Sequence, residues 1–145
     1  MTATGSRRSG RAYALQLLYA RDNDAAADLS GAVGAWASEF ELEIESEAQE
    51  FAKDLVAKAT ANSGKIDELI ATSSKNWRLE RMSRVDRNIL RLGATELLAS
   101  PDVPVKVVIN EAVELAKRFG TAESSAFVNG VLDRIAAAVG RSPEA

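Results

Sequence analysis

Cysteine and histidine are both absent from the 145 residues of this chain. Without cysteine the protein has no disulfide bond, no thiolate nucleophile and no zinc site built from sulfur ligands. Without histidine it lacks the commonest metal ligand and the commonest general base. An enzyme built from this chain would have to work with carboxylates, lysines, hydroxyl groups and tyrosines. Thiolate and histidine chemistry is therefore excluded, and the sequence assigns no catalytic residue, no metal ligand and no cofactor.

Long apolar segments are absent as well. No apolar run approaches the roughly 20 residues that span a bilayer, and no apolar core with a cleavage site follows the N-terminal arginines. We expect a cytoplasmic protein that does not bind membranes. A chain of 145 residues buries roughly 68–70 % of its unfolded surface, so its apolar core is expected to suffice for folding.

The charges are distributed unevenly along the chain, although the net charge is only −3. Residues 1–21 contain four arginines and no acidic residue, and residues 22–50 contain nine acidic residues and no basic one. Residues 75–91 contain six basic residues against two acidic ones. Two basic segments around an acidic one predict a protein with one side that faces a polyanion.

The clearest helical pattern lies between Val103 and Leu132. When residues 107–119 are wound as a helix, one broad arc is apolar and the opposite arc is polar, with Val107 as the one apolar residue on the polar side. Pro104 is suited to the first helical turn. Gly120 is suited to the position just past the helix end, where a left-handed backbone is expected. So wide an apolar arc predicts a central helix of a multi-helix core.

The rest of the chain is also helical in pattern, and no convincing strand or internal repeat is found. Ser46 and Gln49 form a capping box at the start of one helix, and Ser83 marks the start of another. The expected helices cover residues 9–21, 29–40, 46–64, a short segment from Ile66 that includes Trp77, 83–99, 104–119 and 122–139. We predict an all-α fold of about seven helices over residues 9–139, preceded by a flexible basic arm (1–8) and followed by a tail (140–145).

Two groups of arginines are candidate phosphate contacts. Arg7, Arg8 and Arg11 lie in the arm, and the planar guanidinium fork matches a phosphate group. The alternative is a solubilising terminus. Arg84, Arg87 and Arg91 are spaced i, i+3, i+7 and share the polar face of one helix. Here the alternative is a solvated face with local ion pairs.

Buried and aromatic side chains give further candidates. Glu96 falls on the apolar face of the helix 83–99, where a carboxylate must be paired, hydrogen-bonded or protonated, and a structural role is favoured over catalysis. The aromatic residues Tyr13, Tyr19, Phe119 and Phe127 offer faces on which unstacked RNA bases can rest. The alternative is that these rings belong to the core.

The segments WRLERMSRVDRNILRLGATELL (77–98) and DVPVKVVINEAVELAKRFGTAESSAFVNGVLDRI (102–135) closely resemble the bacterial transcription antitermination factor family NusB. The segment ALQLLY (14–19) is similar to the first helix of that family. The resemblance implies two packed three-helix-bundle-like halves, at about 9–75 and 76–139. It also implies a non-enzymatic role, the binding of single-stranded boxA RNA of ribosomal-RNA leader transcripts. The implied partners are NusE, a small-subunit ribosomal protein, and the antitermination complex of RNA polymerase.

The resemblance also implies roles for individual residues, as follows. The residues implied to contact RNA are Arg7, Arg8, Arg11, Tyr19, Glu123 and Phe127. The implied NusE surface includes Asp86. Arg87 and Arg91 lie beside Asp86 and could contact either the RNA or NusE. Ser9 and Gly10 interrupt an arginine cluster that is denser in many relatives, which predicts low RNA affinity without NusE.

Three alternatives stay open. Some relatives self-associate, so a homodimer is one of them. A similar domain precedes the catalytic part of some ribosomal-RNA cytosine methyltransferases, which makes an RNA-targeting module the second. The chain ends soon after the last expected helix without a glycine-rich cofactor loop, and this favours the standalone factor. The third alternative is a protein–protein adaptor without RNA contact.

Overall fold

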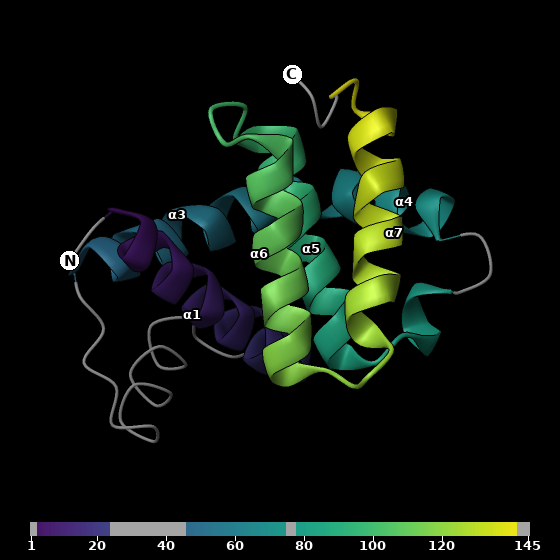
Figure 1. The fold of residues 1–145 in the computed structure, drawn as a ribbon, viewed down its shortest axis with the longest axis horizontal. Coiled ribbons are helices and arrows are strands. Elements are labelled where there is room, and N and C mark those ends of the chain that lie inside the picture. The colour runs from purple at the N-terminus through teal and green to yellow at the C-terminus, as the bar shows by residue number, and fades with distance from the viewer. Residues whose placement is uncertain (1–2, 24–45, 75–77, 142–145) are drawn as a thin grey trace. The chain divides into compact units, whose positions relative to one another are not determined.

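Helices account for all the regular structure in the described part of the chain. The computed structural model describes residues 3–23, 46–74 and 78–141 (Figure 1). The elements in these ranges are α1 (Ala3–Asn23), α3 (Ser46–Ala61), α4 (Ser63–Ser73), the 3-10 turn η1 (Leu79–Arg81), α5 (Arg84–Ala99), α6 (Val105–Phe119) and α7 (Ser124–Ala138). The predicted all-α class is confirmed. The helix expected over 29–40 and the residue Trp77 lie outside the described residues.

The chain divides into two compact units between Ala57 and Lys58. α4 belongs to the second unit, because it packs on α5 and α7 through the buried side chains of Ile66, Leu69 and Ile70. The resemblance predicts halves that meet near residue 75 and so groups α4 with the N-terminal helices. The division into halves at about 9–75 and 76–139 stays a prediction.

The first unit contains α1 and most of α3. α1 begins at Ala3 and not near Ser9, so Arg7 and Arg8 lie on a helix, whereas the sequence analysis expects a flexible arm there. Alanine and arginine both favour helix, and Arg7 contacts a ring on α3. Contact with a second helix adds to local propensity and helps to hold this first part of α1 in helical form.

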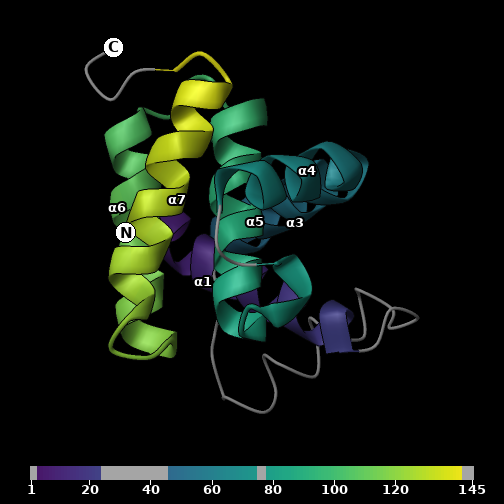
Figure 2. The ribbon, with the colours of Figure 1, turned by 90° about the vertical axis from the view of Figure 1, so that its right-hand side faces the viewer.

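In the second unit α5, α6 and α7 each contact the other two helices. Figure 1 shows α6 and α7 running alongside each other with α5 next to them. Figure 2 shows α4 on the other side of α5 from α6. The helices bury a core that includes Ile89, Leu90, Val108, Val128, Leu132 and Ile135. No described helix has the length and apolar character needed to cross a membrane.

The ends of α5 agree with the sequence prediction. The Ser83 hydroxyl caps its N-terminus by accepting the Asp86 N–H at 3.1 Å, and such a cap is typically worth about 1 kcal/mol. The helix ends at Ala99, directly before Ser100 and Pro101. These boundaries were predictable because both signals are local.

The prediction for Gly120 is wrong. Its φ of −99° and ψ of −164° are extended and lie outside the left-handed region. The residue needs to be small for another reason, because a Cβ there would lie 2.5 Å from the Ser124 Oγ and 2.8 Å from the Ala116 carbonyl oxygen. Within the described residues the glycine with a positive φ is Gly140, at 77°.

The break between the helices predicted over 46–64 and from Ile66 comes three residues earlier than predicted. α3 starts at Ser46, as the capping box indicates, but it ends at Ala61. The Asn62 side-chain amide donates to the Lys58 carbonyl oxygen at 2.9 Å, and a local side-chain bond of this kind competes with helix continuation. α4 begins at Ser63 and includes Gly64 in its first turn.

Candidate nucleic-acid interface

The three N-terminal arginines differ in their exposure. Arg7 and Arg8 are exposed, whereas Arg11 is only 4 % exposed. The guanidinium carbons of Arg7 and Arg11 lie 5.6 and 5.3 Å from the centroid of the Phe51 ring. These distances are within the range of cation–π contacts. Of the three arginines, Arg7 and Arg8 therefore provide most of the exposed surface that could contact a phosphate.

The two tyrosines of α1 have opposite environments. Tyr13 is fully buried, and burial raises the pKa of its hydroxyl above the usual value of 10.0. Tyr19 is 37 % exposed. Arg8 and Tyr19 are eleven positions apart, which places them on the same face of the helix with a separation of about 16 Å along its axis. Tyr19 is thus the α1 ring available for stacking on a base.

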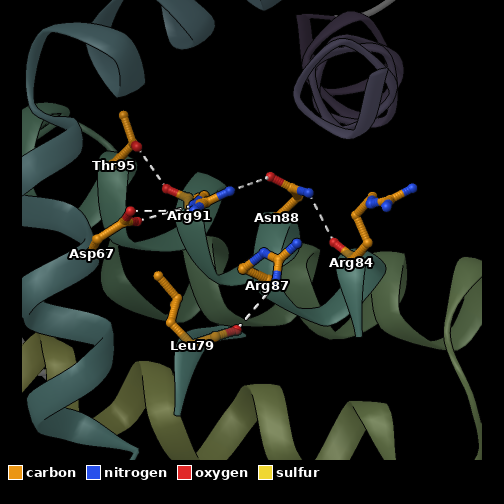
Figure 3. Close-up of polar contacts among 7 residues, drawn as sticks. All are labelled: Asp67, Leu79, Arg84, Arg87, Asn88, Arg91 and Thr95. Carbon is orange, nitrogen blue, oxygen red and sulfur yellow. Dashed lines mark hydrogen bonds and ion pairs between the residues drawn. The ribbon is translucent and has the colours of Figure 1, made fainter. Parts of the chain in front are cut away.

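The polar side of α5 carries a network of hydrogen bonds (Figure 3). The Arg91 Nε and Nη2 donate to the two carboxylate oxygens of Asp67 on α4, at 3.0 and 3.2 Å. The Arg91 Nη1 donates to the Asn88 Oδ1 at 3.2 Å. A two-pronged bond of this kind between arginine and carboxylate is among the stronger polar contacts in proteins. Arg91 therefore joins α4 to α5.

Its neighbours on α5 are held within the same unit. The Arg87 Nη1 donates to the Leu79 carbonyl oxygen in η1 at 3.2 Å, and the Asn88 amide donates to the Arg84 carbonyl oxygen at 2.8 Å. The Thr95 hydroxyl donates to the Arg91 carbonyl oxygen at 2.6 Å. Arg87 and Arg91 are half-buried. This arrangement favours the alternative of local contacts for Arg87 and Arg91.

Asp86 lies at the positive end of the α5 dipole, in its first turn. Its Oδ1 is buried and accepts no hydrogen bond from any described residue. An acceptor in this situation lacks the hydrogen bond that buried polar atoms normally make.

Glu123 and Phe127 are brought together at the start of α7. The Phe127 N–H donates to the Glu123 carbonyl oxygen at 3.2 Å, so the two residues lie in successive turns on one face. Glu123 is exposed and Phe127 is half-buried. The Thr121 hydroxyl donates to the Glu123 Oε2 at 3.2 Å, and the Thr121 N–H donates to the Ser124 Oγ at 2.9 Å. These bonds hold an acidic acceptor beside an aromatic ring.

The remaining candidates belong to the core or its edge. Glu96 is 2 % exposed, which agrees with its predicted place on the apolar face of α5. Phe119 is half-buried, with the Arg118 guanidinium carbon 4.9 Å from its ring centroid. No group of three or more histidine, cysteine, aspartate or glutamate side chains among the described residues is arranged to hold a metal ion.

Sequence reasoning missed three residues that shape these surfaces. Phe51 has no local signal, because an aromatic residue on an amphipathic helix is typical of a core position. Asp67 is a partner of Arg91 from another helix. Thr121 orients Glu123 through its hydroxyl, and a Gly-Thr turn does not by itself predict this bond. That the basic segments form one side facing a polyanion stays a prediction.

The described residues define an all-helical protein whose surface includes two exposed arginines and an exposed tyrosine on α1. The chain belongs to the NusB family, whose model matches residues 8–137. It is 51 % identical to the transcription antitermination protein NusB of Myxococcus xanthus over 138 residues, which are 94 % of this chain and 99 % of the relative.

Solved structures with the same fold are similar over almost the whole chain. A structure of T. maritima NusB is 38 % identical, with a TM-score of 0.80 and coverage of 95 % of this chain and 94 % of the other. A crystal structure of the antitermination factors NusB and NusE in complex with dsRNA is 29 % identical, with a TM-score of 0.81 and coverage of 92 % and 97 %.

Proposed function

We propose that this protein is a transcription antitermination factor that binds boxA RNA of ribosomal-RNA leader transcripts together with NusE. The observation that carries the proposal is its membership of the NusB family over residues 8–137. A family neighbour solved in complex with NusE and dsRNA supports NusE and an RNA as ligands. We further propose that it has no enzymatic activity and acts in the cytoplasm as part of the antitermination complex of RNA polymerase.

The RNA contacts divide by chemistry. The exposed Arg7 and Arg8 of α1 contact phosphates and supply affinity without sequence preference. Tyr19 and Phe127 offer ring faces to unstacked bases, and the Glu123 carboxylate accepts from a base edge. Sequence preference therefore arises from the aromatic and acidic groups. Arg11 is buried and contributes charge from beneath the surface.

The NusE contact is assigned to the start of α5. Asp86 has a buried carboxylate oxygen that accepts no hydrogen bond from the described residues, and Arg87 is half-exposed beside it. The family resemblance assigns Asp86 to the NusE surface. Arg91 is paired with Asp67, so its role is to join α5 to α4 and not to make the first contact with RNA or NusE.

A titration of boxA RNA tests the proposal directly. The affinity is measured for single-stranded boxA, a scrambled sequence and a boxA duplex, each with and without NusE and at two salt concentrations. We expect NusE to raise the affinity for single-stranded boxA more than for the scrambled RNA, and RNA to raise the affinity for NusE by the same factor. Equal affinity for boxA and scrambled RNA under all conditions contradicts the proposal. NusE binding without RNA retention instead favours the protein–protein adaptor.

The oligomeric state is measured in the same samples, because self-association that occludes the RNA surface competes with RNA. If the protein is a homodimer of this kind, sedimentation gives a dimer alone and a monomer when NusE and boxA are present. A monomer under both conditions removes self-association from the account.

A further inference from the structure

Two arginines of α1 share one aromatic ring of α3. Arg7 and Arg11 occupy successive turns, and their guanidinium carbons lie 5.6 and 5.3 Å from the Phe51 ring centroid. Like charges at this spacing repel each other, whereas the negative face of the ring attracts both. Phe51 is half-buried, so the ring is partly shielded from water and its attraction is less screened.

The close approach of α1 to α3 depends on Gly10. A Cβ at this position would lie 2.7 Å from the Phe51 Cδ1 and 3.0 Å from the Ala48 carbonyl oxygen. The glycine that interrupts the arginine cluster therefore lets the ring reach the arginines on either side of it. Gly10, which interrupts the basic cluster in the sequence, is therefore a point of close contact between α1 and α3.

We propose that Phe51 is a positioning residue for RNA binding, which orders the Arg7 and Arg11 side chains before the RNA arrives. A free arginine side chain loses conformational entropy when it contacts a phosphate, and preorganisation reduces that loss. The guanidinium is planar, so a ring that fixes the position of its central carbon also restricts where its N–H donors can lie. The exposed Arg7 is then ready to donate, while the buried Arg11 adds positive charge below it. This inference rests on the proposed function.

The first test requires no RNA. In the NMR spectrum of the full chain, the ring current of Phe51 is expected to shift the side-chain protons of Arg7 and Arg11 away from their ordinary positions. Phe51→Leu removes the shift, and Phe51→Tyr retains it. Ordinary Arg7 shifts in the wild type overturn the inference, whatever the RNA measurements give.

The second test is a double-mutant cycle with single-stranded boxA RNA in the presence of NusE. The variants are Phe51→Leu, Arg7→Ala and the double variant. Phe51→Leu is expected to weaken binding about two- to fivefold, the effect of one exposed cation–π contact. Arg7→Ala is expected to have a smaller effect in the Phe51→Leu background than in the wild type, and Phe51→Tyr restores affinity.

Matched controls separate positioning from folding. Ile66→Val shortens a buried side chain on α4 and is expected to lower thermal stability with unchanged RNA affinity. Phe51→Met replaces Phe51→Leu if the latter does not fold. An equal Arg7→Ala effect in both backgrounds overturns the positioning role while the proposed function stands. Equal wild-type affinity for boxA and scrambled RNA refutes the proposed function, and the inference falls with it.

Discussion

At the scale of single residues, aromatic side chains perform different tasks that depend on burial. Tyr13 is fully enclosed, whereas Tyr19 is more than a third exposed, and both lie on the same helix. Phe51 is half-buried against two arginines. A ring in the core contributes through the area it buries, while a ring at the surface contributes through its face. Only the surface rings are candidates for binding bases.

Burial of Tyr13 predicts a loss of stability at alkaline pH. The pKa of its hydroxyl is raised by burial above 10.0, so above this pH the unfolded chain releases a proton that the folded chain retains. The stability is complete below pH 10 and falls as the pH rises towards the folded pKa, by up to about 1.4 kcal/mol per pH unit.

Denaturant unfolding of the wild type and Tyr13→Phe at several pH values checks this. The phenylalanine variant has no hydroxyl to ionise, so its stability is expected to fall less steeply above pH 10. Parallel curves for the two proteins contradict the predicted role of Tyr13.

At the scale of the helices, close packing requires small residues at particular contact points. In the second unit a Cβ on Gly93 of α5 would lie 2.7 Å from the Leu132 Cδ1 and 3.3 Å from its Cγ, on α7. Leu132 is itself fully buried and has little space into which to move. The side chain of Gly93 is a single hydrogen atom, and any larger side chain there would push α5 and α7 apart.

Gly93→Ala is expected to destabilise the protein by about 1–3 kcal/mol, the usual cost of overpacking a core. Gly130→Ala is the matched control, because a Cβ there meets nothing within 4 Å and a helical alanine is favoured over glycine by about 1 kcal/mol. Thermal or urea unfolding measures both. If the two variants shift stability in the same direction, the contact between Gly93 and Leu132 does not limit the packing.

A polar link between helices gives a second prediction at this scale. Asp67→Asn removes the negative charge on α4 that pairs with Arg91 of α5. The Arg91 and Asp67 side chains are 23 % and 36 % exposed, and the substitution is expected to lower the free energy of unfolding by about 1 kcal/mol. The control is Glu114→Gln, which breaks the pair between Lys117 and Glu114, where both side chains are more than half exposed. Equal stability of the two variants would mean that Arg91 does not join the helices.

How far the sequence predicts the structure depends on the range of the interaction. The ends of α5 followed from Ser83 and Pro101, because a cap and a proline act within one turn. The backbone at Gly120 was mispredicted, because its small size serves a contact with Ser124 and not a left-handed turn. The Asp67 partner of Arg91 and the Phe51 ring over Arg7 join different helices, and no periodicity within one helix reveals them.

At the scale of the whole molecule, an acidic protein is proposed to bind an acidic ligand. The net charge of −3 repels RNA at long range, so binding depends on where the arginines lie. Of the six basic residues between 75 and 91, Arg91 and Arg87 on α5 are engaged by Asp67, Asn88 and the η1 backbone. The exposed arginines of α1 therefore carry the phosphate contacts in our account.

The most direct test of this claim is the salt dependence of boxA binding by the wild type and the Arg7→Ala/Arg8→Ala double variant, both with NusE present. Each phosphate contact on a single strand contributes about −0.7 to the slope of log affinity against log salt. We predict that the double variant binds more weakly and that its slope is shallower by about 1.4. Identical slopes for the two proteins would contradict the account.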